Sequence, residues 1–532
     1  VDLGGTGKPD ILILESEFKD GRLSRFANPG SSLKDPGLEG PWKEQRLLDD
    51  VVYGHSLDVR EAAGSVRVMI GEMEQGGWDA PYNHGARVLE LRTTDRGASW
   101  TQDLIGKGEG THQALWADVD GDGELEVAGK SAGFYYCSPV VQVWKRVSTP
   151  SPVARLRHRM VDRDKPATGV EILPCDVDGD GRVDVICGKW WYRNPGIPGR
   201  GAWERREIPG VAQVINTHDI DGDGRPELIC IQAPRASKGD FYSDLSAQLC
   251  WLKAVDPIAG TWKLHEIGTG MGDWPHGSLL GPFGRGGRLA LAVSYHSAYN
   301  NPRHYPQLFE VPKDPTAGGW PVRTLAPIQY NEEMLAGEVA GSGRADIIAG
   351  PWWLENLGNG EFTPHRYAPE DIVVGRMGLM KIAGSGRQDV VIGQEVADWQ
   401  RKIIPLSPLV WLERPANPRE VPWPVHVIDW VFCAHSIGIG DVDGDGEDEV
   451  VCGEHNPFWP YRSRCRLLVY KKADSGGRSW KKITLDDRFE HHVGAKVFPW
   501  AVGGEAGPGR QAILSHGWKD SIYVHLWEPT GE

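Results

Sequence analysis

The sequence has 532 residues and a formal net charge of −15 at pH 7. An acidic chain is a poor partner for nucleic acid or an anionic membrane surface, so we expect neither. No apolar run is long enough to cross a bilayer. No segment keeps a helical period, whereas 68 glycines and 38 prolines provide many turns. The composition therefore favours an all-β protein.

Residues 118–126 (Asp-Val-Asp-Gly-Asp-Gly-Glu-Leu-Glu) form an acidic loop with carboxylates at offsets 0, 2, 4 and 8 around two glycines. Several carboxylates on a glycine turn are the oxygen ligands that Ca²⁺ prefers. Three more copies keep these offsets, which predicts four structural calcium sites. The expected ligands are Asp118, Asp120, Asp122, Glu126, Asp176, Asp178, Asp180, Asp184, Asp219, Asp221, Asp223, Glu227, Asp441, Asp443, Asp445 and Glu449.

An EF-hand or dockerin is the first alternative for these loops. The EF-hand continues from its loop into a helix and needs a bidentate Glu at the twelfth position. Here each loop runs directly into β-branched apolar residues, as at 183–187 and 449–452. The repeated unit is therefore predicted to be strand, acidic turn, strand.

The whole chain repeats with a period near fifty residues. Ten units begin near Val1, Tyr53, Thr111, Thr168, Ala212, Trp274, Asn331, Gly375, Ala434 and His491. Each unit has the pattern of four antiparallel strands, which is the blade of a β-propeller. We expect one domain over residues 1–532, a ring of about ten units with seven to ten blades.

Some units are incomplete. Residues 341–346 and 384–389 keep the turn and the last Asp but lose the central carboxylates, so we expect them to turn without binding metal. The first unit lacks most of its first strand, and the tenth lacks a clear fourth strand. A ring closed by strands from both chain ends explains both deficits, and so does a sequence from which part of the chain is missing.

The acidic loop followed by a strand resembles the FG-GAP/VCBS repeat of integrin-type propellers. Residues 190–195 and 352–356, both beginning Trp-Trp, look like third strands of such repeats in carbohydrate-active proteins. More narrowly, residues 435–449 and the insertion after residue 72 resemble the propeller of fungal aldos-2-ulose dehydratases, which act on 1,5-anhydrofructose. Their cupin domains are absent here. Propellers also occur among polysaccharide lyases and in a rhamnosidase family.

The eight cysteines leave the compartment open. Residues 175 and 187, 230 and 250, and 452 and 465 lie on adjacent predicted strands, and disulfides and buried thiols fit equally well. Calcium loops and 23 tryptophans favour a secreted or periplasmic protein.

Five histidines share one repeat position, six residues before the start of the loop. Six residues of strand span about 20 Å, so this position lies at the face opposite the acidic turns, around the mouth of the central channel. Each His either bonds the neighbouring blade or serves in acid–base catalysis or as a ligand of a divalent metal. The candidates are His55, His112, His276, His435 and His492.

Long aromatic and polar insertions open on the same face, and binding groups gather in such loops. Tyrosine and tryptophan rings stack on sugars, and Arg binds carboxylates. In the histidine register, Glu332 occupies the position itself and Arg376 the next one. The predicted substrate contacts are Tyr82, His84, Tyr295, His296, Arg303, His304, Tyr305, Glu332, Arg376, Trp399, His455, Trp459, Tyr461, Arg462, His516 and Trp518.

These groups suit β-elimination on a carbohydrate. A cation acidifies the α-proton, one His or Tyr removes it, and another His protonates the leaving oxygen. The sequence therefore predicts a sugar or polysaccharide lyase or dehydratase. The alternatives are a non-catalytic calcium-dependent lectin or adhesion propeller, and a glycoside hydrolase that uses paired carboxylates such as Glu332, Glu333 or Glu395.

Overall fold

The chain forms two compact units, Val1–Thr149 and Pro150–Glu532, where the sequence predicts a single domain. Each unit is described by itself. The computed structural model describes residues 1–3, 7–28, 42–62, 64–73, 83, 85–107, 110–121, 123–131, 141–145, 156–165, 169, 171–196, 201–233, 246–299, 301–330, 332–398, 400, 404–456, 465–487, 489–502, 505–517 and 523–529.

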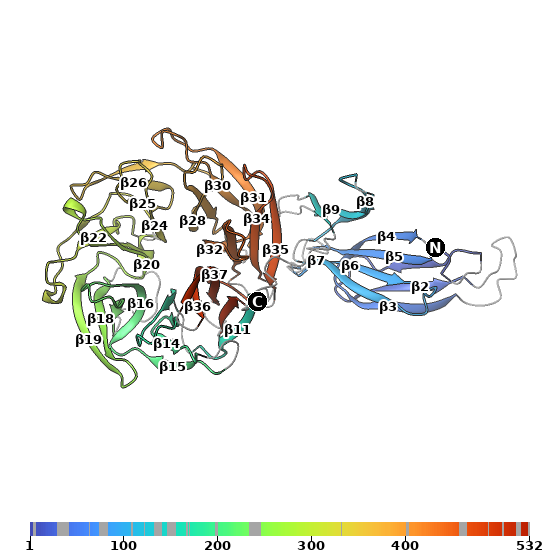
Figure 1. Cartoon of the computed structure of the whole chain (residues 1–532). Helices are drawn as coiled ribbons and strands as arrows, with labels where there is room; N and C mark the ends of the chain where they lie inside the picture. The colour runs from blue at the N-terminus through green and yellow to red at the C-terminus, as the bar shows by residue number, and fades with distance from the viewer. Residues whose placement is uncertain are drawn as a thin grey trace. The chain divides into compact units, whose positions relative to one another are not determined.

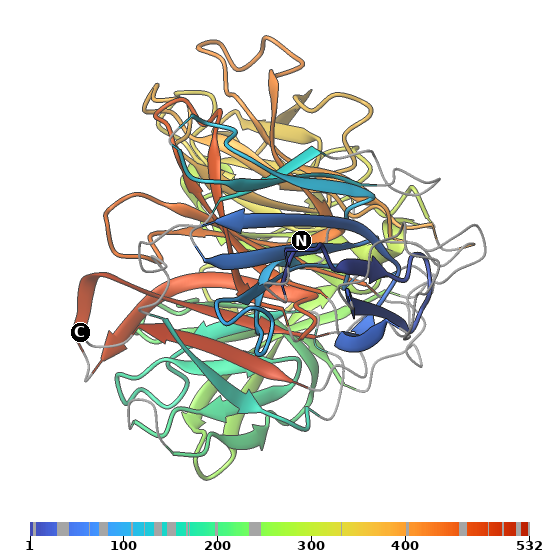
Figure 2. The ribbon, with the colours of Figure 1, turned by 90° about the vertical axis from the view of Figure 1, so that its right-hand side faces the viewer.

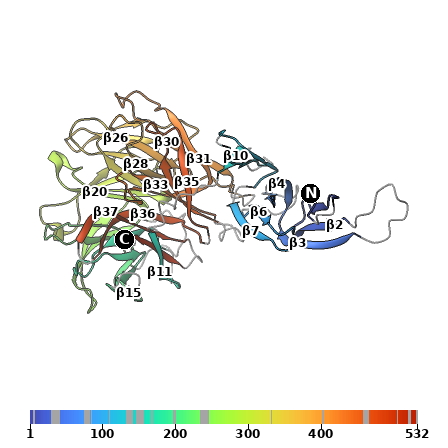
Figure 3. The same ribbon diagram turned by 45° about the vertical axis from the view of Figure 1, so that its right-hand side comes forward.

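Among the described residues of the first unit there are three antiparallel sheets, whose strands are coloured blue to teal in Figures 1 and 3. Their strands are β1 (Ile11–Leu14), β2 (Gly21–Ala27) and β3 (Lys43–Val51); β4 (Gly54–Ala62), β5 (Ser65–Glu72), β6 (Arg87–Thr93) and β7 (Thr101–Lys107); and β8 (Gln113–Ala117), β9 (Glu126–Lys130) and β10 (Val141–Trp144). Strands β1 and β8 both contact β4, so the sheets pack side by side.

The second unit contains seven four-stranded sheets among its described residues, and six of them use consecutive strands. These six are β12 (Ile172–Cys175), β13 (Asp184–Cys187), β14 (Trp190–Arg193), β15 (Glu204–Glu207); β16 (Val211–His218), β17 (Glu227–Gln232), β18 (Gln248–Asp256), β19 (Thr261–Thr269); β20 (Pro275–Gly281), β21 (Ala290–Tyr295), β22 (Gln307–Glu310), β23 (Val322–Thr324); β24 (Met334–Gly337), β25 (Asp346–Ala349), β26 (Trp352–Asn356), β27 (Phe362–Arg366); β28 (Arg376–Met380), β29 (Asp389–Gly393), β30 (Leu406–Leu412), β31 (Val425–Phe432); and β32 (Ala434–Gly440), β33 (Glu449–Glu454), β34 (Leu467–Lys472), β35 (Trp480–Asp486).

The seventh sheet joins strands from both ends of this unit. It has the order β11 (Leu156–Asp162), β38 (Val524–Pro529), β37 (Glu505–His516), β36 (Val493–Val502). Strand β11 pairs antiparallel with β38, with Leu156 opposite Pro529. In Figures 1 and 2 the teal β11 lies beside the red C-terminal strands. The fourth strand missing from the tenth repeat is thus supplied by residues 156–162, at the end of the third predicted repeat.

The first strands of the seven sheets contact one another in sequence: β12 with β16, then β20, β24, β28, β32 and β36, and β36 again with β12. This circuit is closed, so the second unit is a seven-bladed β-propeller. Figure 1 views the propeller nearly along its axis. Strands such as β20, β24, β28 and β32 are innermost, and β19, β31 and β35 lie on the outside. The expected all-β propeller of four-stranded antiparallel blades is confirmed.

Burial follows strand order within a blade. Every residue of β21 and β33 is buried, because these second strands have sheet neighbours at both edges and packed blades on both faces. The outermost strand β31 begins with alternating exposed and half-buried residues. Apolar runs such as Ala-Leu-Ala-Val-Ser-Tyr therefore become second strands, and alternating sequences become outer ones.

Inner strands approach closely where glycine is present. A Cβ at Gly438 would meet the carbonyl oxygen of Ala495 on the next blade, and a Cβ at Gly277 would meet the carbonyl oxygen of Glu332. Any larger residue there would force neighbouring blades apart.

Short 3₁₀ turns are the only helical segments in the described residues: η2 (Arg285–Gly287), η3 (His296–Tyr299) and η4 (Pro315–Ala317). No helix among these residues has the length and apolar character needed to span a membrane. The described cysteines are free and buried; they are Cys175, Cys187, Cys230, Cys250, Cys433, Cys452 and Cys465.

We expect Leu526→Ala, in β38, to destabilise the ring. Leu526 is fully buried in an apolar cluster that also contains Leu514 and Ile172 of β12, so it links the closing sheet to the first blade. Its truncation is expected to cost about 2–5 kcal/mol, measured as a fall in the urea midpoint. The control Leu264→Ala, at a 40% exposed position of β19, is expected to change the midpoint little. Equal effects of the two substitutions would contradict this role of the closing sheet.

Candidate functional site

The shared histidine position lies at the start of each inner strand of the propeller. His276 and His435 are the second residues of β20 and β32, and His492 directly precedes β36. The acidic turns follow the other end of these strands, as with the loop at 441–449 after β32. The two sets of polar groups therefore occupy opposite ends of the inner strands, as the sequence predicts.

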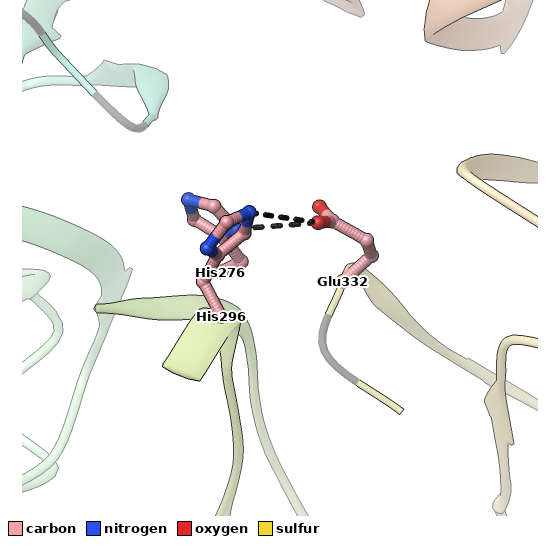
Figure 4. Close-up of side chains that lie close together, drawn as sticks. All are labelled: His276, His296 and Glu332. Carbon is pink, nitrogen blue, oxygen red and sulfur yellow. Dashed lines mark ion pairs between the residues drawn. The ribbon is translucent and has the colours of Figure 1, made fainter. Parts of the chain in front are cut away.

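A first cluster joins two histidines to a carboxylate. His276 begins β20, His296 opens the 3₁₀ turn after β21, and Glu332 lies just before β24. Glu332 Oε1 is 3.5 Å from His276 Nδ1 and 3.8 Å from His296 Nε2. The two rings lie 4.4 Å apart, and Figure 4 shows both facing the carboxylate. Arg376 Nη2 lies 3.4 Å from Glu332 Oε2.

A second cluster contains three histidines whose rings pack against one another. The rings of His435 and His492 are parallel at 4.1 Å, and His455 packs edge-on against His492 at 3.9 Å. His435 Nδ1 donates to the carbonyl oxygen of His492 at 2.8 Å, and its Nε2 lies 3.3 Å from Glu395 Oε2. His455 is hydrogen-bonded to the buried Glu490.

A small pocket lies where five inner strands begin. It is lined by Glu171, Glu333, Arg376, His435, Ser436, Ile437, Val493, Gly494 and Lys496. Lys496 Nζ is 2.7 Å from Glu333 Oε1 and 3.8 Å from Glu171 Oε2. These residues lie on, or one position before, β12, β24, β28, β32 and β36, so the pocket sits at the propeller axis.

Burial and neighbouring charge move the pKa values of these groups in different directions. Burial alone would lower the pKa of His435, but the charge and hydrogen bond of Glu395 outweigh burial, and the pKa is raised. Burial lowers the pKa of His276 to about 4 despite Glu332. Burial, together with His455 and His435, holds the pKa of His492 well below its ordinary range. Burial raises the pKa of Glu171 against the effect of Lys496. The pocket therefore contains a histidine that favours its charged form and a carboxyl group with raised basicity.

His55 and His112 belong to the first unit. Their rings stack at 4.1 Å, and His55 Nδ1 donates to the carbonyl oxygen of His112 at 2.6 Å. The same bond joins His435 to His492. His55 and His435 thus each hydrogen-bond to the neighbouring sheet of their own unit. His435 also lines the pocket.

Three other predicted contacts take part in internal hydrogen bonds. Tyr295 donates to Gln307 at 2.7 Å, His304 bonds Ser297 and Asn301, and His516 lies 3.3 Å from Lys165 Nζ. Arg303 is exposed and Tyr305 is half-buried, and the pocket lining includes neither of them. The predicted site residues that lie outside the described residues are Tyr82, His84, Asp122, Trp399, Trp459, Tyr461, Arg462 and Trp518.

Lys496 is a charged pocket residue that no sequence pattern singled out. It lies four positions after His492 on β36, where no repeat pattern distinguishes it. Glu333 was predicted only as a carboxylate of the hydrolase alternative, and Glu171 was not selected, although both stand one step after the shared histidine position, as Arg376 does. Glu490 lies outside that register.

In the acidic loops, the first and last carboxylates hydrogen-bond to the turn itself. Asp441 accepts from the amides of Gly444 and Gly446, and Glu449 accepts from the amide of Val442. The loops at 118 and 219 repeat this pattern, and Asp346 of a degenerate loop accepts from the amide of Val339. The last carboxylate therefore shapes the turn in intact and degenerate copies alike. The first carboxylate does so in the intact copies and, as Glu338, in one degenerate loop, whereas the other has Lys381 there.

The central carboxylates surround a basic side chain from the third strand of the same blade. Lys253 Nζ lies 2.6 Å from Asp223 and 3.7 Å from Glu227, and it also bonds Asp221. Lys145, Arg193 and Lys471 make the corresponding contacts. Continuing the strand register by one residue places each basic residue directly opposite the last acidic residue of its loop.

The two degenerate loops lack this basic residue. Continuing the register from Ile347–Leu354 and Val390–Leu412 places Glu355 and Glu413 at the equivalent positions. The basic residue is thus present where central carboxylates are present and is replaced by Glu where they are lost. The loop carboxylates lie close enough together to hold a cation. The basic side chain of each loop contacts the same carboxylates that a calcium ion would need as ligands.

No family model and no curated protein matches the sequence. Among solved structures, the exotype rhamnogalacturonan lyase YesX is similar at 13% identity and a TM-score of 0.36, over 90% of both chains. YCF48 from Cyanidioschyzon merolae is similar at 12% identity and a TM-score of 0.39, over 70% of this chain and 98% of that one. At such scores neither likeness adds to the description of the site.

We expect Lys471→Met to lower stability in calcium-free buffer by roughly 1–3 kcal/mol, because Asp443 and Glu449 lose their counterion. Added Ca²⁺ is then expected to raise the Tm of this variant more than that of the wild type, because the cation site is vacated. Calorimetry with and without Ca²⁺ measures both effects. The control is Lys263→Met on the exposed face of β19. An identical calcium response of wild type and Lys471→Met would contradict competition between lysine and calcium.

Proposed function

We propose that the chain is a carbohydrate-active carbon–oxygen lyase, a polysaccharide lyase or sugar dehydratase that acts by β-elimination at the axial pocket. The observation that carries the proposal is the pocket lining itself, which combines two cations, a histidine with raised pKa and a buried carboxyl group with raised pKa. β-Elimination needs each of these elements.

Arg376 and Lys496 supply the positive charge. Both line the pocket, and each is held by carboxylates, Arg376 by Glu332 and Lys496 by Glu333. Cations fixed at a buried site stabilise the negative charge that develops on a substrate carboxylate or carbonyl as the α-proton leaves. The proposed substrate is accordingly a uronate-containing polysaccharide or a keto sugar.

Glu171 and His435 are the proposed base and acid. The Glu171 carboxylate takes the α-proton, and the electrons of that C–H bond form the new double bond. The C–O bond to the leaving group then breaks, and the His435 imidazolium gives its proton to the departing oxygen. The raised pKa of His435 favours the protonated form that an acid needs. The raised pKa of Glu171 makes its carboxylate a stronger base.

The repeats are proposed to be of the FG-GAP/VCBS type, on the basis of the acidic turns between first and second strands. Calcium at these turns is a proposal that the lysine substitution tests. A polysaccharide substrate and calcium loops both suit a secreted or periplasmic protein. No nucleic acid or membrane partner is proposed.

We expect His435→Asn, Lys496→Met and Glu171→Gln each to reduce kcat/KM by about 10²–10⁴-fold. The assay is the ultraviolet absorbance of the unsaturated product, with a panel of uronate polysaccharides and 1,5-anhydrofructose as substrates. The matched control His265→Asn changes a histidine stacked on Trp251, outside the pocket, and is expected to keep full activity. Reducing ends released without the absorbance would instead indicate a hydrolase, and sugar binding without turnover a lectin. Either outcome contradicts the proposal.

We expect Glu395→Gln to shift the alkaline limb of the kcat/KM profile to lower pH. Glu395 raises the pKa of His435, so the acid stays protonated, and activity persists, until the pH rises through that raised value. Removing the carboxylate charge lowers the pKa and brings the loss of activity to lower pH. The control Glu413→Gln removes a similar partner from His426, 3.0 Å away and outside the pocket. An unshifted profile for Glu395→Gln would contradict the assignment of His435 as the acid.

A further inference from the structure

The cluster of His276, His296 and Glu332 has N···O distances longer than those of an ordinary hydrogen bond. The two N···O separations are 3.5 and 3.8 Å, beyond the usual range of about 2.7–3.2 Å for a hydrogen bond. Ligands held about 2.0–2.2 Å from a tetrahedral ion lie about 3.3–3.6 Å from one another. The ligand atoms of all three side chains lie within 4.8 Å of one another. The spacing is therefore close to that of groups gathered around a common ion.

The three side chains converge from three separate segments. They come from the start of β20, from η3 and from the segment just before β24. In Figure 4 both imidazoles turn a nitrogen toward the carboxylate. The side chains are 9%, 22% and 6% exposed for His276, His296 and Glu332 respectively. They are thus fixed by packing, and the His296 side remains reachable from solvent.

The carboxylate is oriented by a neighbour. Glu332 Oε1 faces the two histidines, while Oε2 faces Arg376 at 3.4 Å. A second partner that holds the unused oxygen of a ligand is the usual arrangement around a metal site. It leaves Oε1 aimed at the space between the two rings.

We propose that His276, His296 and Glu332 form a binding site for one divalent transition-metal ion such as Zn²⁺, Mn²⁺ or Fe²⁺. Two imidazoles and one carboxylate select these ions over Ca²⁺ and Mg²⁺, which prefer oxygen ligands. Three protein ligands leave at least one position open for water or a substrate oxygen. The proposal stands on these side chains and does not need the chain to be a lyase.

The position of this site connects it with the axial pocket. Arg376 contacts Glu332 and also lines the pocket. A bound ion would therefore lie one side chain away from the groups assigned to proton transfer. If the lyase proposal holds, the ion adds a Lewis acid for a substrate oxygen.

The nearby set of His455, Glu490 and His492 provides the contrast. It is also a group of potential ligands, but His455 hydrogen-bonds directly to Glu490, so this pair is satisfied without an ion. A His455 substitution is therefore a matched control for a His296 substitution.

The test uses the purified full chain, stripped with chelator and kept in millimolar Ca²⁺ so that the acidic loops do not compete. Zn²⁺ is titrated by calorimetry, and Co²⁺ binding is followed by its visible absorption bands. We expect one Zn²⁺ per chain and a Co²⁺ spectrum typical of nitrogen and oxygen ligands. His296→Ala is expected to weaken Zn²⁺ binding at least 100-fold and to abolish the bands, whereas His455→Ala keeps both.

His296 is the more exposed of the two histidines, so its variant is expected to fold; circular dichroism and Tm check this. Glu332→Gln gives a second, near-isosteric variant that is also expected to lose the ion. Absence of a stoichiometric Zn²⁺ site in the wild type would overturn the proposal, and so would binding that survives His296→Ala and Glu332→Gln. Loss of binding in His455→Ala alone would move the site to the other cluster. None of these readouts depends on sugar turnover.

Discussion

Closure of the ring is the constraint on which the second unit depends. Six blades are built from consecutive strands, but the seventh exists only when β11 pairs with β38, more than three hundred and sixty residues later. Without that pairing, the inner strands β36 and β12 would not be held side by side, and both edges would be open for wrong pairing. The apolar cluster shared by Leu526, Leu514 and Ile172 strengthens the same junction.

Closure also creates the site. The pocket residues lie on, or directly before, inner strands of five blades and extend from Glu171 to Lys496 in sequence. Each blade contributes one or a few side chains, and glycines such as Gly438 let neighbouring strands approach closely enough for those side chains to meet. Opposite charges in and beside this small pocket then shift one another's pKa values, as Glu395, which is not part of the lining, does for His435.

Local patterns predicted much of this arrangement. The acidic turns and the apolar runs after them predicted the first and second strands, and the repeat register placed His276, His435 and His492 at one end of the inner strands. Ring size could not be predicted, because the β11–β38 pairing is long-range and residues 156–162 carry no signal that separates them from the third repeat. The division into two units was missed for the same reason.

The site was predicted in part, since the register selected Glu332 and Arg376 but not Lys496, whose role depends on which blade stands across the axis. The lysines that contact the acidic turns were also not predicted. Lys253 and Lys471 belong to third strands, and only strand pairing brings them to carboxylates some thirty residues earlier. A pattern confined to one loop could not reveal a counterion from another strand.

The equivalent starting positions of the inner strands have a consequence for evolvability. The chain already varies this position freely, with His in three blades of the ring and Glu, Gln or a neighbouring Arg in others. One substitution there alters a single wall of the cavity, while the turns that shape the blade lie at the far end of the strand and stay unchanged. New chemistries can therefore arise through substitutions in one blade at a time, while the scaffold stays unaltered.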